Sequence, residues 1–262
     1  MSTQTPSTLR VAPDPSSPRL TRAVTGVDQT GASIDLRVVE ERPLTIYLNS
    51  REIVTAMTIG DHPEWLALGF LVNQGMVRAA DEVTGIDYDE ELETVVVRTA
   101  VETDHEAKLA RATRTSGCAI GTVFGDMMEG LEGLTLPPTP LHVRDLNALS
   151  SAINRTCLCR GPDPLAYFED VGRHNAVDKL AGWMRDTGTD PADKTLYTTG
   201  RLTSEMVIKC ALMGVPILVS RSGFTAWGVE IARQVGLTVI GRMKGSRFVC
   251  LSGEGRVIWD AE

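Results

Sequence analysis

Residues 169–179 read Glu-Asp-Val-Gly-Arg-His-Asn-Ala-Val-Asp-Lys, and this polar stretch leads directly into the alternating second half of the chain. Apolar side chains follow it at helical spacing: Val177, Leu180, Trp183 and Met184. We therefore predict a helix from about Asn175 to Gly188. A polar cluster at a helix start is either a solvated helix end or an anion site, because backbone N–H groups and the helix dipole converge there. Spacing alone leaves both interpretations open.

Strands and helices alternate after this stretch, which predicts a partly parallel sheet with helices packed on it. The expected strands are residues 195–199, 216–220 and 237–241. The expected helices lie near residues 203–213 and around Trp227, Ile231 and Val235, and they end at Gly214 and Gly236. Two further apolar runs, residues 248–251 and 256–259, predict a closing hairpin around residues 252–255.

The first half predicts a mixture of strands and one helix. Strand-like alternation covers residues 19–60, and a further strand is expected at 94–99. The expected helix at 65–74 follows Asp61, which we take as its N-cap, and stops at Gly75. Residues 137–140, Pro-Pro-Thr-Pro, form a rigid connector, and Leu146, Leu149 and Ile153 mark a helix after it.

These patterns predict an α/β protein in three parts. Residues 1–18 are rich in Ser, Thr and Pro and read as a disordered tail. Residues 19–135 form an N-terminal α+β portion that includes the Cys118 loop, and residues 141–262 form an α/β core that binds a ligand.

Charge and hydropathy exclude some functional classes. The 262 residues carry a net charge of −8, which argues against non-specific binding to nucleic acid or to anionic membranes. No apolar run approaches the ~20 residues that a membrane-spanning helix needs. The N-terminus has no apolar core of a secretory signal, so we expect a cytoplasmic protein.

Three polar loops follow the three expected strands of the C-terminal half. They are residues 200–205, 220–223 and 242–247, and each combines arginine with glycine or hydroxyl groups. Forked guanidinium groups and exposed backbone N–H groups are what grip phosphates. Because ligands bind beyond the carboxyl ends of parallel strands, we favour a site for an anionic ligand over ordinary loops with solvated arginines. Its candidate residues include Arg201, Ser222, Arg242, Lys244 and Arg247.

The five cysteines fall into three groups. Cys210 and Cys250 lie in apolar patterns and are predicted to be core residues. Cys157 and Cys159 have no second Cys/His pair at zinc spacing, so we expect no metal site there. Cys118 lies between Gly117 and Gly121 near arginines, where it is either an activated thiol or an inert turn residue.

The long motif of residues 169–179 resembles the FdhD family of formate dehydrogenase accessory proteins. So do Gly-Arg-Leu-Thr-Ser-Glu-Met-Val-Ile-Lys at 200–209 and Gly-Leu-Thr-Val-Ile-Gly at 236–241. The segment from Thr58 to Met76 also looks like that family's N-terminal segment. The resemblance covers nearly the whole chain after the tail.

This resemblance implies a fold, a cargo and partners. The fold is a cytidine-deaminase-like α/β core with a smaller N-terminal α+β portion, in a homodimer. The cargo is the molybdenum cofactor, bis-molybdopterin guanine dinucleotide. Sulfur would come from a cysteine desulfurase as a persulfide and serve the formate dehydrogenase catalytic subunit. The zinc signature of deaminases is absent from the sequence, so the resemblance does not extend to deamination.

By position, Cys118 matches the family's persulfide cysteine and residues 242–247 match its cofactor-binding loop. Arg242, Lys244 and Arg247 would supply charge, Gly245 would allow close backbone approach, and Met243 and Ser246 complete the loop. Arg173 and His174 would either contact phosphate or order the neighbouring loops.

Two departures from the family pattern leave the mechanism open. The family commonly has Cys-x-x-Cys at the active loop, whereas residues 118–121 here read Cys-Ala-Ile-Gly. The segment before the long motif is also shortened, and Cys157 or Cys159 is a speculative replacement for the missing thiol. The chain is therefore either a sulfurtransferase that acts through Cys118 or a non-catalytic chaperone that delivers the cofactor. A nucleotide-binding hydrolase is a third, weaker hypothesis.

Overall fold

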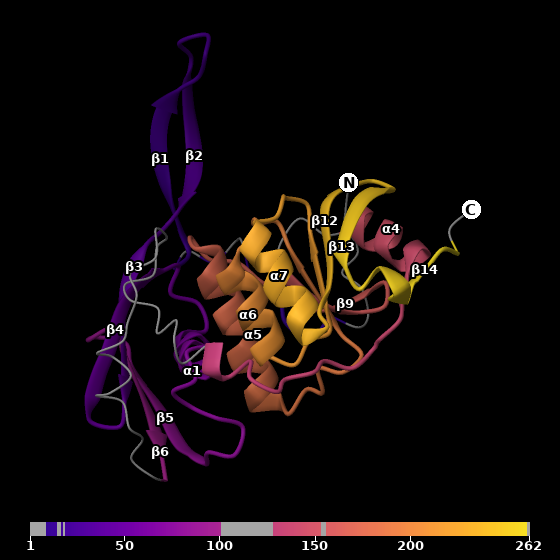
Figure 1. Ribbon diagram of the computed structural model, residues 1–262. Coiled ribbons are helices and arrows are strands. Elements are labelled where there is room, and N and C mark those ends of the chain that lie inside the picture. The colour runs from indigo at the N-terminus through magenta and orange to yellow at the C-terminus, as the bar shows by residue number, and fades with distance from the viewer. Residues whose placement is uncertain (1–8, 15–16, 18, 101–127, 153–155, 261–262) are drawn as a thin grey trace.

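The computed structural model describes residues 9–14, 17, 19–100, 128–152 and 156–260. Within them, the C-terminal half forms one six-stranded mixed sheet of strand order β13-β12-β11-β10-β8-β9 (Figure 1). Its strands are β8 (Thr156–Arg160), β9 (Asp163–Phe168), β10 (Thr195–Thr198), β11 (Ile217–Ser220), β12 (Thr238–Lys244) and β13 (Arg247–Ser252). The three central strands, β10 to β12, run parallel, and the outer ones pair antiparallel.

Helices cover both faces of this sheet. The helices α5 (Arg173–Thr187), α6 (Ser204–Leu212) and α7 (Ala226–Val235) lie on one side, and α4 (Val143–Ala152) lies on the other (Figure 1). Strand residues alternate between the two faces, as the period of two requires. Leu196, Leu218 and Val239 pack under α5 to α7, whereas their neighbours Tyr197, Val219 and Ile240 join the α4 cluster.

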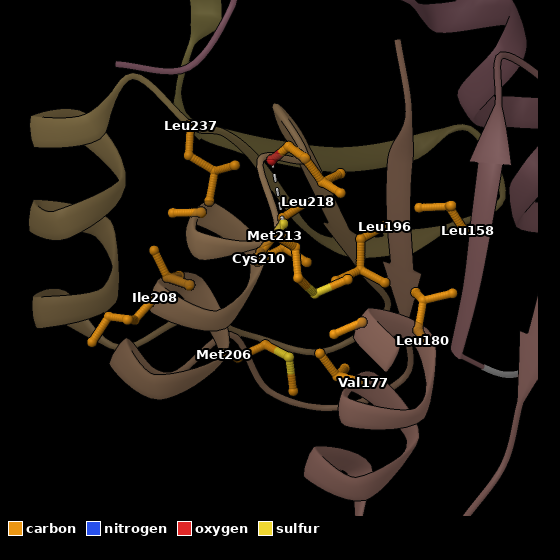
Figure 2. Close-up of a cluster of buried hydrophobic side chains, with 14 of the residues drawn as sticks. Leu158, Val177, Leu180, Leu196, Met206, Ile208, Cys210, Met213, Leu218 and Leu237 are labelled. Atoms are coloured by element: carbon orange, nitrogen blue, oxygen red, sulfur yellow. Dashed lines mark hydrogen bonds between the residues drawn. The ribbon is translucent and has the colours of Figure 1, made fainter. Parts of the chain in front are cut away.

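The predicted helices of this half are confirmed, together with two of their ends. Gly188 and Gly236 cap α5 and α7 with left-handed φ values of 60° and 73°, which glycine adopts without a Cβ clash. Cys210 is fully buried on α6 between apolar side chains (Figure 2). Its predicted role as a core residue is therefore confirmed.

The N-terminal half forms a four-stranded sheet of order β4-β3-β6-β5. Its strands are β3 (Arg42–Leu48), β4 (Arg51–Thr58), β5 (Val83–Asp89) and β6 (Thr94–Thr99). Helix α1 (Pro63–Asn73) packs its apolar residues on this sheet and its other side on α5 (Figure 1). This helix is therefore buried between the four-stranded sheet of the N-terminal half and α5 of the C-terminal half.

Two glycines allow α1 and α5 to cross closely. A Cβ at Gly69 would collide with the backbone carbonyl of Asp178, and a Cβ at Gly182 would collide with the backbone of Trp65. The indole N–H of Trp65 also donates to the Asp186 carboxylate at 3.1 Å. The backbones of α1 and α5 are therefore in direct contact where the two halves meet.

A two-stranded arm projects from the rest of the described chain (Figure 1). It consists of β1 (Thr21–Val27) and β2 (Ser33–Val39), paired antiparallel. Its cross-strand partners Val24 and Leu36 are 42% and 54% exposed. A lone two-stranded ribbon is marginally stable, so this element depends on contacts at its base.

The predicted closing hairpin is wrong. β13 pairs with β12, and a short 3-10 turn (Glu254–Arg256) turns the chain away. The final strand β14 (Val257–Ile258) then pairs in parallel with β7 (Leu141–His142). Arg256 holds this turn by donating to the carbonyl oxygen of Gly236 and, at 3.2 Å, to the Thr238 hydroxyl.

Two further expectations differ from the structure. Asp61 is not the N-cap of α1, because His62 takes that position and the Asp61 carboxylate binds Lys179 instead. Within the predicted tail, Val11 forms a parallel bridge with Ala166, so this residue is paired with the core. The mixed α/β class is confirmed, whereas the likeness to cytidine deaminases and the domain boundaries stay predictions.

Candidate functional site

The three predicted loops meet at one edge of the six-stranded sheet, because β10, β11 and β12 are parallel. Hydrogen bonds connect them directly. The Ser220 hydroxyl donates to the Gly200 carbonyl at 2.6 Å, and the Arg242 N–H donates to the Ser222 carbonyl at 2.7 Å. Arg201 and Arg242 are exposed on this edge. The sequence prediction that these segments lie together is confirmed.

The segment 242–247 is not a loop as predicted. β12 continues to Lys244 and β13 starts at Arg247, so only Gly245 and Ser246 form the turn. Past Gly241 the strand is irregular, because Arg242 adopts a left-handed φ of 53° within the register shift between Gly241 and Lys244. Its guanidinium Nε lies 4.0 Å from the position of a Cβ on Gly223.

The side chains of this hairpin point in different directions. Arg242, Lys244, Gly245, Ser246 and Arg247 are exposed, whereas Met243 is only 1% exposed and packs in the α4 cluster. Alternation along β12 buries Met243, and its side chain is therefore not available for the predicted contact with a cofactor.

The motif at 169–179 has two structural roles, and the first is to join the two halves. The fully buried ammonium of Lys179 binds the carboxylates of Asp61 and, at 2.6 Å, Asp170. Asp170 also accepts from the Thr58 hydroxyl at 2.6 Å, and Asn175 donates to the Met57 carbonyl at 2.7 Å. These contacts leave Arg173 and His174 as the motif's candidates for the ligand site.

A second buried ionic group lies behind those two residues. Lys209 on α6 donates to both Asp178 carboxylate oxygens, at 3.0 and 2.8 Å, and Asn73 of α1 donates to the same carboxylate at 2.7 Å. Glu205 lies 3.7 Å from the Lys209 ammonium. Burial raises the pKa of both Asp178 and Glu205.

His174 faces this group and is uncharged at neutral pH. Its Nδ1 lies 3.3 Å from the Glu205 carboxylate, and both side chains are about nine-tenths buried. Burial, together with the positive charges of Lys209 and Arg173, lowers the pKa of His174 to about 3. His174 therefore supplies no positive charge to a phosphate.

Several buried polar atoms that have no hydrogen-bond partner among the described residues gather at the starts of α5 and α6. They are Arg173 Nε, His174 Nδ1, Thr203 Oγ1 and Glu205 Oε1. Thr203 is the N-cap residue of α6, yet its hydroxyl makes no capping bond. Arg173 crosses Gly200 so closely that a Cβ there would collide with its side chain. Unsatisfied buried groups beside two helix N-termini are typical of a ligand site.

The residues present fit the guanine-dinucleotide cofactor that the resemblance implies. Its pyrophosphates need the cations and backbone donors found at Arg173, Arg201 and Arg242, and its rings need polar groups such as Thr203 and Glu205. Thr203 and Glu205 belong to the predicted polar loop 200–205, but the sequence did not mark them individually as candidates for the site. Both lie in the segment 200–209 that carries the resemblance, which is the signal that marks them.

The cysteines of the described residues are unsuited to nucleophilic chemistry. Cys157 and Cys159 are fully buried, with their sulfurs 3.4 Å apart, and burial raises the pKa of Cys159. Burial also raises the pKa of Cys210 and of Cys250. A thiol held in its protonated form is a poor nucleophile. The speculation that Cys157 or Cys159 replaces the missing thiol is therefore wrong, and Cys118 lies outside the described residues.

Two searches of the described residues bear on metals and membranes. No group of three or more His, Cys, Asp or Glu side chains there is arranged to hold a metal ion. No helix in the same part of the chain has the length and apolar character needed to span a membrane.

Comparison with known proteins assigns the chain to a family. The FdhD/NarQ family profile matches residues 39–258, so the chain belongs to the FdhD/NarQ family. The sulfur carrier protein FdhD of Geobacillus kaustophilus is 30% identical over 234 residues, which cover 83% of this chain and 89% of that protein. The protein of the same name from Bacillus subtilis is 29% identical over 232 residues, covering 83% and 88%.

A solved structure shares the fold. The crystal structure of a protein from Desulfotalea psychrophila, described as a formate dehydrogenase accessory protein, superposes with a TM-score of 0.70 at 26% identity. The match covers 91% of this chain and 98% of that one.

Proposed function

We propose that this chain is a formate dehydrogenase accessory protein that binds the molybdenum cofactor, bis-molybdopterin guanine dinucleotide, and delivers sulfur to it. Membership of the FdhD/NarQ family supports this proposal, as do relatives named sulfur carrier proteins. The observation that carries the cofactor-binding part is the group of unpartnered buried polar atoms at the starts of α5 and α6.

The cofactor's phosphates would lie at the edge where β10, β11 and β12 end. Arg201 and Arg242 would bind them from the loops, and Arg173 from the first turn of α5, where the helix dipole also favours anions. Ser222 would add a hydroxyl. The neutral His174 and Glu205 would hold Arg173 and the ligand's polar edge in place.

Sulfur would pass through Cys118 in two steps. The Cys118 thiolate attacks the outer sulfur of a cysteine persulfide on the desulfurase, and the desulfurase cysteine leaves as a thiolate. Cys118 would hold this persulfide for the bound cofactor: loss of the outer sulfur as a neutral atom would return Cys118 to its thiolate, and the molybdenum would supply the two electrons that reduce this sulfur to a sulfido ligand. The loaded cofactor is handed to the formate dehydrogenase catalytic subunit, and we propose that the protein acts in the cytoplasm as a homodimer.

A chaperone without sulfur transfer is the second candidate. It is favoured by Gly121, which stands where the family commonly has a second cysteine, and by the burial of Cys157, Cys159 and Cys210. Both candidates share the cofactor site and differ only in the need for Cys118.

Cofactor retention tests the shared part of the proposal. The protein is purified from a host that makes the cofactor, and its molybdenum and acid-released GMP are measured. Wild type should retain both, and Arg201→Ala combined with Arg242→Ala should retain less than a tenth. The control Arg22→Ala combined with Arg37→Ala, on the arm, should match wild type. Equal retention by the two double variants would refute binding at this edge.

A further inference from the structure

The β1–β2 arm carries many of the exposed apolar side chains of this protein. Five of the twelve large apolar side chains that are exposed in the described chain lie on these two strands. The arm projects away from the body, and these side chains are open to solvent along its length (Figure 1). Exposed apolar groups that gather on one element mark an interaction surface, whereas scattered ones need no explanation.

The register of the arm places most of these side chains on one face. Residues that are paired across the two strands share a face, and the faces alternate along each strand. One face, which we call the arm face, consists of three pairs: Arg22 with Val38, Val24 with Leu36, and Gly26 with Ile34. Apart from one arginine, the side chains of the arm face are apolar.

The opposite face of the arm carries a polar side chain in each of its pairs. The Thr25 hydroxyl donates to the Asp35 carboxylate at 2.7 Å, and Arg37 Nε donates to the Thr21 hydroxyl at 2.8 Å. These groups bond to one another within the arm and remain in contact with water. The opposite face is therefore stable against solvent, and the arm face is the one that gains from being covered.

The arm face presents no unpaired charge. Its one charged side chain, Arg22, forms an ion pair with Glu40 at 3.2 Å. Surfaces that recognise a different protein commonly display charges that steer the partner and select it. A neutral apolar face instead suits a second copy of itself, because no like charges meet across a two-fold axis.

We propose that the arm faces of two copies of this chain pack on each other about a two-fold axis through the middle pair. The two arms run in opposite directions, which places the two bodies at opposite ends of the contact and keeps them apart. Val24 and Leu36 then meet the same two residues of the second copy. This inference rests on the homodimer of the proposed function and names its contact surface, in a segment that precedes the match to the family at residue 39.

The outer pairs of the arm face complement each other in this arrangement. The base of one arm lies over the tip of the other, so that Val38 meets Ile34 of the second copy and Arg22 lies over Gly26. A Cβ on Gly26 would meet nothing within 4 Å, which leaves open space for the long arginine side chain. Three contacts of matching size therefore repeat along the arm.

The size of the arm face sets the strength of the contact. At ~3.3 Å per residue and ~4.8 Å between strands, each seven-residue ribbon has a face of about 23 by 10 Å. Two such faces bury on the order of 500–800 Å², which is below the ~1,200 Å² of a stable complex. We therefore expect a reversible dimer that separates on dilution.

Charges placed on the arm face test the contact. Val24→Asp combined with Leu36→Asp sets carboxylates against the same carboxylates of the second copy. Sedimentation equilibrium with the full chain measures the dissociation constant of the dimer, which should rise tenfold or more. The control, Ala23→Asp combined with Val27→Asp, adds the same charge to the opposite face of the arm and should dimerise as wild type does.

A second set of variants tests the direction of the two arms. Val38→Lys and Ile34→Glu should each dimerise weakly alone, because each homodimer sets two charges against apolar side chains. An equal mixture should form a heterodimer, in which the introduced ammonium and carboxylate meet at one end and the native side chains meet at the other. A mixture that dimerises no better than either variant alone would overturn the proposed packing.

Two further outcomes would refute the inference. Dimerisation of Val24→Asp combined with Leu36→Asp at wild-type strength would assign the homodimer to another surface. Wild type that is monomeric at all concentrations, together with failure of this double variant to support formate dehydrogenase activity, would show that the arm face docks a different protein. Retention of molybdenum and GMP by the same variants reports cofactor binding separately, so the proposed function can stand when the arm assignment fails.

Discussion

Lys179 shows how one residue connects the two halves of the chain. Its ammonium is fully buried between a carboxylate of the N-terminal half, Asp61, and one of the core, Asp170. Removing one partner of a buried ion pair leaves the other charges uncompensated.

We expect Lys179→Met to lower the free energy of unfolding by about 3–5 kcal/mol, because it leaves two carboxylates facing an apolar side chain. Urea unfolding followed by circular dichroism measures this. Lys244→Met, at an exposed site, should change stability by less than about 0.5 kcal/mol. Similar losses for the two variants would show that the buried ion pairs do not matter for stability.

His174 should make stability depend on pH. The unfolded chain protonates this residue below about pH 6.5, whereas the folded protein keeps it neutral down to about pH 3. The unfolded state therefore binds more protons in this range, and stability is lost as pH falls, by at most about 1.4 kcal/mol per pH unit. The test is the difference in unfolding free energy between wild type and His174→Gln from pH 7 to pH 4, which should decrease. Parallel pH curves would contradict a neutral His174.

For single residues, the sequence predicted where polar side chains cluster better than it predicted what each of them binds. The polar cluster at a helix start was visible in residues 169–179, but its division between ion pairs and a ligand site was not. Asp61 looks like an N-cap from its neighbours, yet Lys179, 118 residues away, binds it. Leaving a buried ammonium without a carboxylate costs more free energy than leaving a helix end without a capping side chain. Local pattern contains no information about such distant partners.

At the scale of elements, α1 and α5 cross closely between the two halves. Gly182→Ala would place a methyl group against the backbone of Trp65, and neither helix can move without disturbing its own core. We expect a loss of about 1–3 kcal/mol or more in unfolding free energy. Gly255→Ala, where a Cβ meets nothing within 4 Å, is the matched control. Equal thermal unfolding of the two variants would disprove a tight crossing.

The elements themselves were largely predictable. Glycine ends, apolar periodicity and β-α-β order predicted β10 to β12 and α5 to α7 close to their observed bounds. The errors concern pairing. β13 and β14 were recognised as apolar runs, but each pairs with a different strand, since partner choice depends on which sheet edges are free. Likewise, β12 continues to Lys244, three residues beyond Gly241, which marked its predicted end.

At the scale of the whole molecule, the proposed function combines a cofactor site at one sheet edge with a sulfur carrier at Cys118. The fold, the family and the clustering of Arg173, Thr203 and Glu205 support the first part. The second part depends on a residue outside the described part of the chain. Sequence resemblance assigns Cys118. Among the cysteines that the structure describes, Cys157, Cys159 and Cys210 are buried, and partial burial raises the pKa of Cys250.

The most direct test of sulfur delivery is formate dehydrogenase activity in a host that lacks this gene. The host is complemented with wild type, with Cys118→Ala, or with Cys250→Ala as the control thiol. We predict that wild type and Cys250→Ala restore activity, whereas Cys118→Ala restores less than about a hundredth of it, because loss of a transfer nucleophile typically lowers the rate by several orders of magnitude. Cys118→Ala should still retain molybdenum and GMP. Full activity with Cys118→Ala would contradict sulfur transfer and leave a chaperone that only delivers the cofactor.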